Sequence, residues 1–517
     1  MATMSMLSSA LLFLLCLFAL AGLSISDTPP SRAYLINCGG KDKVTAGGVE
    51  WVPDDVFIGV GNSSKVDTPG ILPQLSTLRY FPDGSARKYC YVIPVSKGAK
   101  YIVRTTYYYG GYDGGKEPPV FDQIIGGTKW STVNTTENYA RGLTAYYEII
   151  AGASGKTMSV CLARNEHTAG SPFISAIELQ YLEDSMYNST DFNSYALATI
   201  ARHRFGGKGR QLISYPDDPF NRNWQLFTDD NPSVTMQWNA SSSDFWNLPP
   251  LLALMNATTT SRGKELVIPW PPIPLPAANY YMALYFQDNH KPSPFSWRVF
   301  DVSVNGQVFY KGLNVSAAGV MVYGTSRSLS GQTTIKLTPD ANSTVGPLIN
   351  AAEILQVVPI GGRTLTRDVI AMEDLARSLT NRPSDWSGDP CLPQQHSWTG
   401  VTCSSGKLAR VVTLNLTSYG ISGSLPASIG TLTSVSSILL GGNKISGPIP
   451  DMGALKELVS LHLENNQLTG SIPQSLGNLP KIKEIFLQGN QLQGGVPDSL
   501  KKRSGVDIQT GSGNEAE

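Results

Sequence analysis

A short period in the last quarter of the chain constrains the fold more than any other feature of the sequence. Four segments there align without gaps: VVTLNLTSYGISGSLP (411–426), VSSILLGGNKISGPIP (435–450), LVSLHLENNQLTGSIP (458–473) and IKEIFLQGNQLQGGVP (482–497). A repeat of 23 or 24 residues is one supersecondary unit, which cannot bury its apolar face alone and must stack on its neighbours. The period therefore predicts a solenoid in this part of the chain.

The pattern shared by the four segments, L-x-x-L-x-L-x-x-N-x-L-x-G-x-I-P, is that of a leucine-rich repeat and resembles the plant extracellular type. Its x-L-x-L-x part predicts a short strand with leucines pointing into the stack, and Gly-x-I-P reverses the chain. Three repeats carry an asparagine after the strand (Asn443, Asn466, Asn490), and we expect its side chain to satisfy backbone groups of the turn. The first repeat has Tyr419 instead, a deviation that suits the end of a stack.

Upstream of the repeats, DWSGDPCLPQQHSWTGVTC (385–403) resembles the N-terminal cap of the same plant repeats. The resemblance implies a disulfide between Cys391 and Cys403 that seals the apolar end of the first repeat. A zinc site would need more ligands than this stretch offers.

A fainter duplication lies in the middle of the chain. PFISAIEL (172–179) recurs as PLINAAEI (347–354), and VFDQIIGG (120–127) recurs as VFDVSVNG (299–306). The second member of each pair lies 175 or 179 residues after the first. Because these two offsets are similar, we expect two copies of one module of about 150 residues. Each copy is rich in Val, Ile, Thr and Tyr with turn residues between short runs, a composition that predicts a β-sandwich.

Six further stretches carry a family resemblance: YLINCGG (34–40), RYFPDG (79–84), YCYVIPV (89–95), VRTTYYYGGYDG…PPVFD (103–122), CLARNEHTAGSPFISAIEL (161–179) and RHRFGG…SYPDDPFNRNW (202–224). They look like a plant malectin-like domain. Residues 31–500 as a whole are similar to the malectin-like and leucine-rich-repeat ectodomain of plant receptor kinases, and to plant di-glucose-binding proteins with leucine-rich repeats. The resemblance implies a mostly β fold, with tandem malectin-like β-sandwiches followed by a short leucine-rich-repeat solenoid. We find neither a transmembrane helix nor a kinase in this sequence, which departs from those receptors.

The expected organisation is a signal peptide, two sandwiches, a linker with the cap, the repeats and a tail. The apolar run LLFLLCLFALAGL (11–23) has the length of a secretory h-region, and the alternative is an N-terminal anchor. The boundaries are 1–26 for the signal peptide, 31–182 and 195–360 for the sandwiches, 365–410 for the linker helix and cap, 411–503 for four repeats and 504–517 for a polar tail.

Glycosylation sequons and cysteines agree with secretion. Once Cys16 is removed with the signal peptide, five cysteines remain, so one thiol is free or bridges two chains. The unpaired thiol is one of Cys38, Cys90 and Cys161, and we expect Cys90 to pair with Cys161, because both lie in predicted strands of one sandwich. The N-x-S/T sequons, all expected to carry glycans, are Asn62, Asn134, Asn188, Asn239, Asn256, Asn314, Asn342 and Asn415.

The stretch YYYGGYDGGKEPPVFD (107–122) is the first candidate for ligand binding. Sugars stack on aromatic rings and donate hydroxyl hydrogen bonds to carboxylates, so Tyr107, Tyr112 and Asp113 have suitable chemistry. The alternative is an ordinary strand followed by a tight turn, with at least one face of the tyrosines in the core. The equivalent loop of the second copy offers Asp288 and Asn289.

Two aromatic residues of that loop, Trp297 and His290, are not expected to bind a ligand. Trp297 stands at the start of a predicted strand, where we expect it in the core, and His290 is expected to be a solvated loop residue. The adjacent acids Asp217 and Asp218 precede a proline, and we expect them to form a turn rather than a catalytic pair.

The repeats present a candidate surface for a protein partner. Between the two strand leucines stand Asn415, Leu439, His462 and Phe486, and Glu464 and Glu484 occupy neighbouring positions. Exposed leucine and phenylalanine beside histidine and glutamate suit a protein contact. The alternative is that the repeats are only a spacer.

Charge and composition narrow the function. Forty Lys+Arg balance forty Asp+Glu, which removes nucleic acid as a partner class. We find no catalytic triad, spaced acid pair, metal cluster or cofactor motif, so we expect no enzyme, no metal and no cofactor. The prediction is a protein secreted to the apoplast or cell wall that binds carbohydrate (a glucose-type oligosaccharide or a cell-wall glycan) while its repeats contact a receptor-kinase ectodomain or a peptide. The alternative function is a co-receptor scaffold that binds no sugar, and the alternative locations are the plasma membrane, reached through a partner, and the endoplasmic reticulum lumen.

Overall fold

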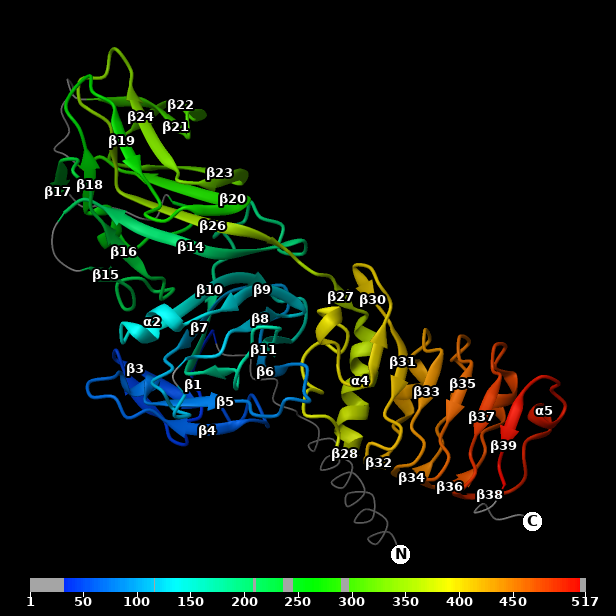
Figure 1. Cartoon of the computed structure of the whole chain (residues 1–517). Coiled ribbons are helices and arrows are strands. Elements are labelled where there is room, and N and C mark those ends of the chain that lie inside the picture. Colours follow the sequence, from blue (N-terminus) through cyan, green and yellow to red (C-terminus); the bar gives the residue numbers. More distant parts are fainter. Residues whose placement is uncertain (1–31, 116, 208–210, 236–244, 290–296, 512–517) are drawn as a thin grey trace, which may run out of the picture. The chain divides into compact units, whose positions relative to one another are not determined.

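The computed structural model describes residues 32–115, 117–207, 211–235, 245–289 and 297–511 (Figure 1). The expected signal peptide, the sequon asparagine Asn239 and His290 lie outside these residues. Within them, no helix has the length and apolar character that crossing a bilayer requires.

The first sandwich consists of two four-stranded layers. Alternate residues of each strand point into the core between the layers, as Tyr89, Tyr91 and Ile93 do, while Cys90 points to the outer face. One layer has the order β1 (Ala33–Asn37), β13 (Ala176–Leu182), β7 (Lys100–Tyr107), β10 (Ala145–Gly152), and the other has β6 (Tyr89–Pro94), β11 (Thr157–Arg164), β8 (Phe121–Ile125), β9 (Thr128–Val133).

The second sandwich repeats this order strand for strand, which agrees with the duplication seen in the sequence. The recurring segments PFISAIEL and PLINAAEI fall at β13 and β26, which occupy the same place in the two sandwiches. Its layers are β14 (Tyr195–Phe205), β26 (Ala351–Pro359), β20 (Leu275–Phe286), β23 (Val320–Gly331), and β19 (Leu266–Pro269), β24 (Thr334–Pro339), β21 (Arg298–Val304), β22 (Gln307–Val315).

Short elements decorate both sandwiches in matching places. The three-stranded sheet β12-β5-β4 of the first has its counterpart in β25-β18-β17 of the second. The bounds are β2 (Val44–Ala46), β3 (Val49–Pro53), β4 (Asn62–Lys65), β5 (Thr77–Tyr80), β12 (Phe173–Ile174), β15 (Leu212–Ile213), β16 (Trp224–Phe227), β17 (Ser233–Thr235), β18 (Asn256–Thr259), β25 (Leu348–Ile349), α2 (Thr136–Ala140) and α3 (Leu251–Leu254).

The two sandwiches share one continuous sheet, because β10 of the first pairs with β14 of the second. A buried ion network crosses this join. Arg202 on β14 contacts Glu148 on β10 (Nη1–Oε1 2.7 Å) and Glu353 on β26 (Nε–Oε2 2.7 Å), and Arg104 on β7 contacts Glu148 (Nη2–Oε2 2.7 Å). Burial alone raises the pKa of Glu148, but the charges of Arg202 and Arg104 outweigh it and hold the pKa at about 2.

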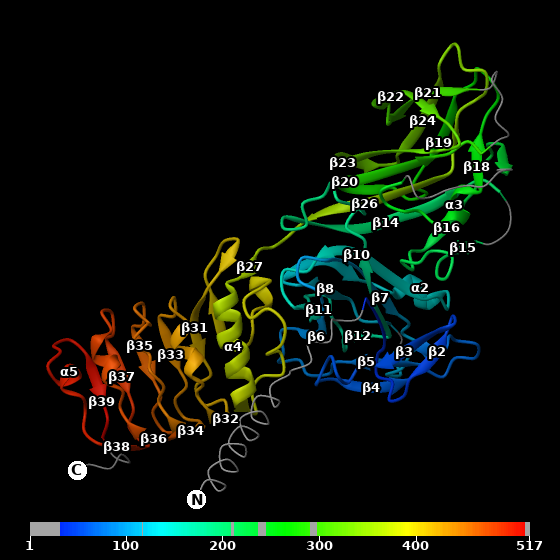
Figure 2. The same cartoon turned by 180° about the vertical axis from the view of Figure 1, so that it is seen from behind.

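Helix α4 (Thr366–Ser378) leads from the second sandwich into the repeats and packs on their first strands (Figure 2). Its buried residues Ala371, Met372 and Leu375 recur at helical spacing and join the repeat core. Asp368 in its first turn accepts hydrogen bonds from the Arg410 guanidinium and the Val411 amide, which ties the helix to β31 (Val411–Asn415).

The repeats form two ladders of parallel strands, and each ladder begins with one antiparallel strand, Val401–Cys403 of the cap in the first and Leu379–Thr380 after helix α4 in the second. Asn466 behaves as expected: its Oδ1 accepts from the Ile445 amide, and its Nδ2 donates to the Leu440 and Leu463 carbonyls. The first ladder is β29 (Val401–Cys403), β31 (Val411–Asn415), β33 (Ser437–Leu439), β35 (Ser460–His462), β37 (Glu484–Phe486), β39 (Asp507–Gln509), and the second is β28 (Leu379–Thr380), β32 (Ser422–Ser424), β34 (Lys444–Pro448), β36 (Gln467–Ser471), β38 (Gln491–Gln493). Strands β27 (Arg363–Thr364) and β30 (Leu408–Ala409) pair with each other, and α5 (Asp498–Lys501) follows β38.

One strand of the first ladder falls in the stretch expected to be only a polar tail. Strand β39 pairs in parallel with β37, so residues 507–509 extend the sheet by one more strand. No leucine-rich pattern marks this strand, because the segment VDIQ contains no leucine and only two aliphatic residues, Val506 and Ile508, both partly buried against the repeat core.

Candidate functional site

The strand face of the repeats brings the predicted partner surface together in one row. The register places Asn415 beside Leu439, Leu439 beside His462, and His462 beside Phe486. All four side chains are at least partly exposed, whereas the leucines and isoleucines on either side of them are buried. We call Leu439, His462 and Phe486 the strand-face row, and β39 adds Gln509 to its end.

Contacts within the row fix the aromatic side chains. The rings of His462 and Phe486 stack with centroids 4.3 Å apart, and His462 Nε2 lies 3.2 Å from Glu484 Oε2. The Ser460 hydroxyl donates to the same carboxylate oxygen at 2.8 Å. Hydrogen bonds from Ser460 and then His462 lower the pKa of Glu484, so this carboxylate stays charged. The result is a preorganised patch of apolar surface beside a negative charge.

Glu464 lies next to the row, over Gly441. A Cβ at position 441 would stand 2.1 Å from Glu464 Oε1, so the carboxylate occupies the space that the glycine leaves open. The predicted partner residues Leu439, His462, Phe486, Glu464 and Glu484 therefore form one continuous surface.

The predicted sugar-binding tyrosines divide between core and surface. Tyr107 as a ligand residue is wrong: it is fully buried, and its hydroxyl donates to Gln123 Oε1. It belongs to the inward face of β7, which is the face of the strand that fills the core. Tyr112 is half-buried against Phe173, and Asp113 is exposed but accepts from the Tyr109 hydroxyl and the Gly115 amide. These bonds are those of a turn.

The matching residues of the second copy do not form an open site either. Asn289 is fully buried and donates to Gln287, so its prediction as a surface ligand residue is wrong. Asp288 forms an ion pair with Arg298 (Oδ2–Nε 2.9 Å). Trp297, expected in the core, is instead 61% exposed, because it precedes the first inward-facing residue of β21.

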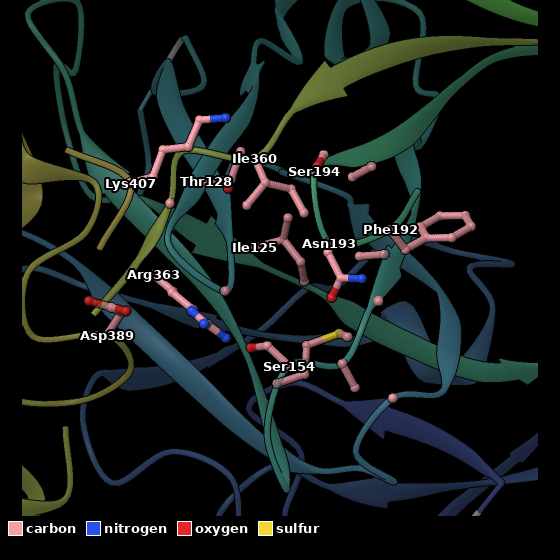
Figure 3. Close-up of a pocket in the computed structure, with 18 of the residues that line it drawn as sticks. Ile125, Thr128, Ser154, Phe192, Asn193, Ser194, Ile360, Arg363, Asp389 and Lys407 are labelled. Atoms are coloured by element: carbon pink, nitrogen blue, oxygen red, sulfur yellow. The ribbon is translucent and has the colours of Figure 1, made fainter. Parts of the chain in front are cut away.

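Sequence reasoning missed a cavity of about 580 Å³, which lies where several segments far apart in the chain converge (Figure 3). Ile125, Asn193 and Arg363 point into it. Arg363 and Lys407 bring positive charge, whereas the carboxylate of Asp389 already accepts from Thr364 and from the Cys391 and Leu392 amides. Its volume is that of a small-ligand site.

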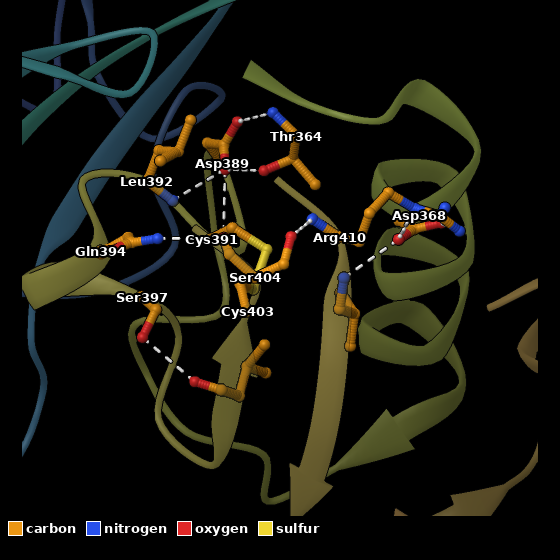
Figure 4. The surroundings of a disulfide bond; sticks show 12 residues. Thr364, Asp368, Asp389, Cys391, Leu392, Gln394, Ser397, Cys403, Ser404 and Arg410 are labelled. Carbon is orange, nitrogen blue, oxygen red and sulfur yellow. Dashed lines mark hydrogen bonds and ion pairs between the residues drawn. A yellow bond between two sulfur atoms is a disulfide. The ribbon is translucent and has the colours of Figure 1, made fainter. Parts of the chain in front are cut away.

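Two disulfides, Cys90–Cys161 and Cys391–Cys403, are present as the sequence predicted, and Cys38 is free and buried. Around Cys391–Cys403, hydrogen bonds from the Cys391 amide to the Asp389 carboxylate and from the Ser397 hydroxyl to the Val401 carbonyl order the cap (Figure 4).

The cap also docks on the outer face of the first sandwich. Lys88 is buried there and donates to the carbonyls of Asp389 (2.5 Å) and Leu392 (2.8 Å). Its burial lowers the pKa of the Lys88 ammonium to about 8. Gly388 lies so close to the Cys90 sulfur that a Cβ would come within 2.8 Å of it.

The remaining predicted residues are the acids of the turn before Pro219 and the sequon asparagines. Asp218 is fully buried and bonded to Arg222 and the Trp224 indole, which makes it structural as expected. Among the described residues, no group of three or more His, Cys, Asp or Glu is arranged to hold a metal. Of the described sequon asparagines, Asn256 is half-buried, and the exposed ones are Asn62, Asn134, Asn188, Asn314, Asn342 and Asn415.

Comparisons with known proteins agree with this architecture. The malectin-like domain family matches residues 36–357, the leucine rich repeat N-terminal domain matches 365–404, and a leucine rich repeat matches 457–479. Two similar Arabidopsis thaliana proteins are the probable LRR receptor-like serine/threonine-protein kinases PAM74, 30% identical over 400 residues, and MEE39, 29% identical over 403 residues. These matches cover 75% and 74% of this chain but only 44% of each relative.

Solved structures show the same fold for the sandwiches. The ANX2 ectodomain from Arabidopsis thaliana superposes with a TM-score of 0.54 at 15% identity, covering 63% of this chain and 97% of that one. A complex of the plant peptide RALF23 with FER and LLG2 gives 0.52 at 18% identity, covering 64% and 96%.

Tandem sandwiches followed by capped repeats define an extracellular, receptor-like recognition ectodomain. The chain belongs to the malectin-like domain family, in the form that carries leucine-rich repeats.

Proposed function

We propose that this chain is a non-catalytic recognition protein whose repeats bind a protein or peptide partner through the strand-face row. The observation that carries the proposal is the alignment of Leu439, His462 and Phe486 on adjacent strands, held beside the charged Glu484. Aromatic anchors fixed in place before binding lose little conformational entropy on association.

The similar structure of the plant peptide RALF23 in complex with FER and LLG2 supports a protein or peptide partner. Support for a non-catalytic role comes from Asp218, because its burial and its pairing with Arg222 leave it no access to substrate. We further propose that the chain acts in the apoplast or cell wall. Retention at the plasma membrane through a partner and residence in the endoplasmic reticulum lumen are the alternatives.

The test is binding of the purified chain to a panel of plant receptor ectodomains and secreted peptides. For any partner found, the His462→Ala/Phe486→Ala variant should weaken binding at least about tenfold, the usual effect of removing central aromatic anchors. Tyr310→Ala removes an exposed aromatic residue of β22 and is the matched control. Equal binding by both variants and the parent would refute the proposed surface.

Carbohydrate binding is the second candidate function, and the cavity of Figure 3 is the observation that favours it. It offers a concave, partly polar wall. A plant glycan array should therefore give a signal that Ser154→Trp, which fills the cavity, abolishes. Loss of the signal in Tyr112→Ala/Asp113→Ala instead would return the site to the turn, and an array without signal would leave the protein-binding function alone.

A further inference from the structure

Trp297 is the most exposed tryptophan among the large apolar side chains of the described surface, at 61%. It is nevertheless held in place by several hydrogen bonds to one short segment, residues 342–344. Its indole N–H donates to the Asn342 carbonyl (3.1 Å), its amide donates to Thr344 Oγ1 (3.0 Å), and its carbonyl accepts from the Thr344 amide (3.3 Å). The ring is therefore exposed to solvent but fixed in position.

The segment that holds Trp297 is an N-glycosylation acceptor, Asn-Ser-Thr. Its backbone is fixed in a turn, since the Asn342 amide donates to Asp340 Oδ1 (2.8 Å) and the buried Ser343 hydroxyl donates to the Val345 carbonyl (2.8 Å). The Asn342 side chain is exposed, and the backbone carbonyl of the same residue accepts the hydrogen bond from the indole.

Two other sequons use the acceptor side chain in local structure. The side chain of Asn256 accepts a hydrogen bond from the Thr235 hydroxyl, and that of Asn415 accepts one from the Thr417 hydroxyl. Neither asparagine is bonded to an aromatic side chain by these contacts.

Two further sequons lack an exposed ring of this kind. The carbonyl of Asn134 accepts from the Tyr147 hydroxyl (3.4 Å), but the Tyr147 ring is half-buried and packs on Tyr107 in the core. Asn314 lies exposed on β22, and within the described residues no hydrogen bond joins its side chain to an aromatic side chain. Asn342 differs from these sequons in having an exposed apolar ring fastened to its own backbone.

A sugar ring presents an apolar face of C–H groups, and an indole presents a broad apolar face that gains free energy when water is removed from it. We propose that Asn342 carries an N-linked glycan whose first sugar packs on the exposed face of Trp297. The glycan then covers the ring, and the ring restrains the glycan over the edge of the second sandwich. The proposal rests on passage through the secretory pathway, which the proposed extracellular function also requires.

The first test is glycopeptide mass spectrometry of the full chain secreted from plant cells. We expect Asn342 to be occupied. If the other exposed sequons carry glycans while Asn342 does not, the present proposal fails and the extracellular function stands. If no sequon is occupied, both fail.

The second test is a double-mutant cycle on thermal unfolding, with Trp297→Ala and Asn342→Gln singly and together. We expect Asn342→Gln to lower the Tm by about 1–3 °C in the parent, and to have no effect in the Trp297→Ala background. Asn314→Gln is the matched control and should show no coupling to Trp297→Ala. Equal shifts from Asn342→Gln in both backgrounds would overturn the proposal.

Enzymatic trimming provides a measurement that needs no substitution. An endoglycosidase that leaves one N-acetylglucosamine on each asparagine should preserve the Tm, because the first sugar makes the contact. A fall in Tm on trimming as large as that caused by Asn342→Gln would place the stabilisation elsewhere in the glycan and refute the contact.

Discussion

The ion network at the join of the two sandwiches makes a quantitative prediction for Glu148→Gln. The Glu148 side chain is 1% exposed and lies between Arg104 and Arg202, whose side chains are 7% and 2% exposed. The substitution keeps the shape of the side chain but removes the charge that both guanidinium groups face. Because Arg202 belongs to the second sandwich, the loss falls on the join itself.

The magnitude follows from the pKa of Glu148. Its fall from the ordinary 4.5 to about 2 means that the folded protein favours the charged form by about 3 kcal/mol, at about 1.4 kcal/mol for each pKa unit. Removing one partner of a buried ion pair costs about 3–5 kcal/mol in other proteins, which agrees. For a folded unit of the size of the two joined sandwiches, a loss of about 3 kcal/mol in the free energy of unfolding lowers the Tm by roughly 5–10 °C.

The pH dependence has a definite sign. The folded pKa lies below the unfolded one, so the stabilisation by Glu148 is fully present above about pH 4.5 and is lost as the pH falls towards 2. The parent and Glu148→Gln should therefore differ most at pH 7 and converge as the pH falls through 4.5 towards 2.

The assay is thermal unfolding followed by tryptophan fluorescence at pH 7 and at several values between about 5 and 3, the range in which the stabilisation begins to be lost. Glu137→Gln is the control, because Glu137 pairs with Arg141 at the exposed surface, where such pairs contribute little. If Glu148→Gln melts within about 2 °C of the parent at pH 7, or if the difference persists unchanged down to about pH 3, the reasoning about the buried network is refuted.

Two further substitutions test the repeats and their cap. Asn466→Ala leaves the buried Ile445 amide without its acceptor and should lower the free energy of unfolding of the repeats by about 2 kcal/mol. The control is Gln467→Ala at the exposed neighbouring position, which should have no such effect. Urea unfolding measures both variants, and equal effects would contradict the role of the asparagine. Gly388→Ala puts a Cβ against Cys90 and should increase hydrogen exchange of the cap where it meets the first sandwich. The control is Gly406→Ala, because Gly406 also has a positive φ but a Cβ there would meet nothing within 4 Å. An equal increase in hydrogen exchange in this variant would mean that backbone strain alone causes the effect.

Much of the architecture could be predicted from the sequence, because it is written in local patterns. The period of the repeats and the asparagines in three of them depend on residues close together in the chain, and the internal duplication is visible because short segments recur in the second copy. Alternation along a strand likewise places Tyr107 on one face of β7, but which face is the core depends on the opposite layer. The Tyr107 prediction therefore failed where non-local information was needed.

The features that could not be predicted all join distant segments. The cavity unites loops of the first sandwich with the linker and the cap, and Lys88 meets Asp389 and Leu392 across about three hundred residues of chain. No periodicity marks such contacts. Asparagine is a residue type typical of surface loops, yet Asn289 is buried because the second sandwich closes around it.

The docking of the cap has a mechanical consequence. Residues Tyr195 and Pro359, at the two ends of the second sandwich, are partners on adjacent strands β14 and β26. The chain therefore enters and leaves the second sandwich at the same point. The cap of the repeats contacts the first sandwich directly through Lys88. A pulling force applied to the repeats would pass into the first sandwich and bypass the second, which would remain folded as an unloaded side branch.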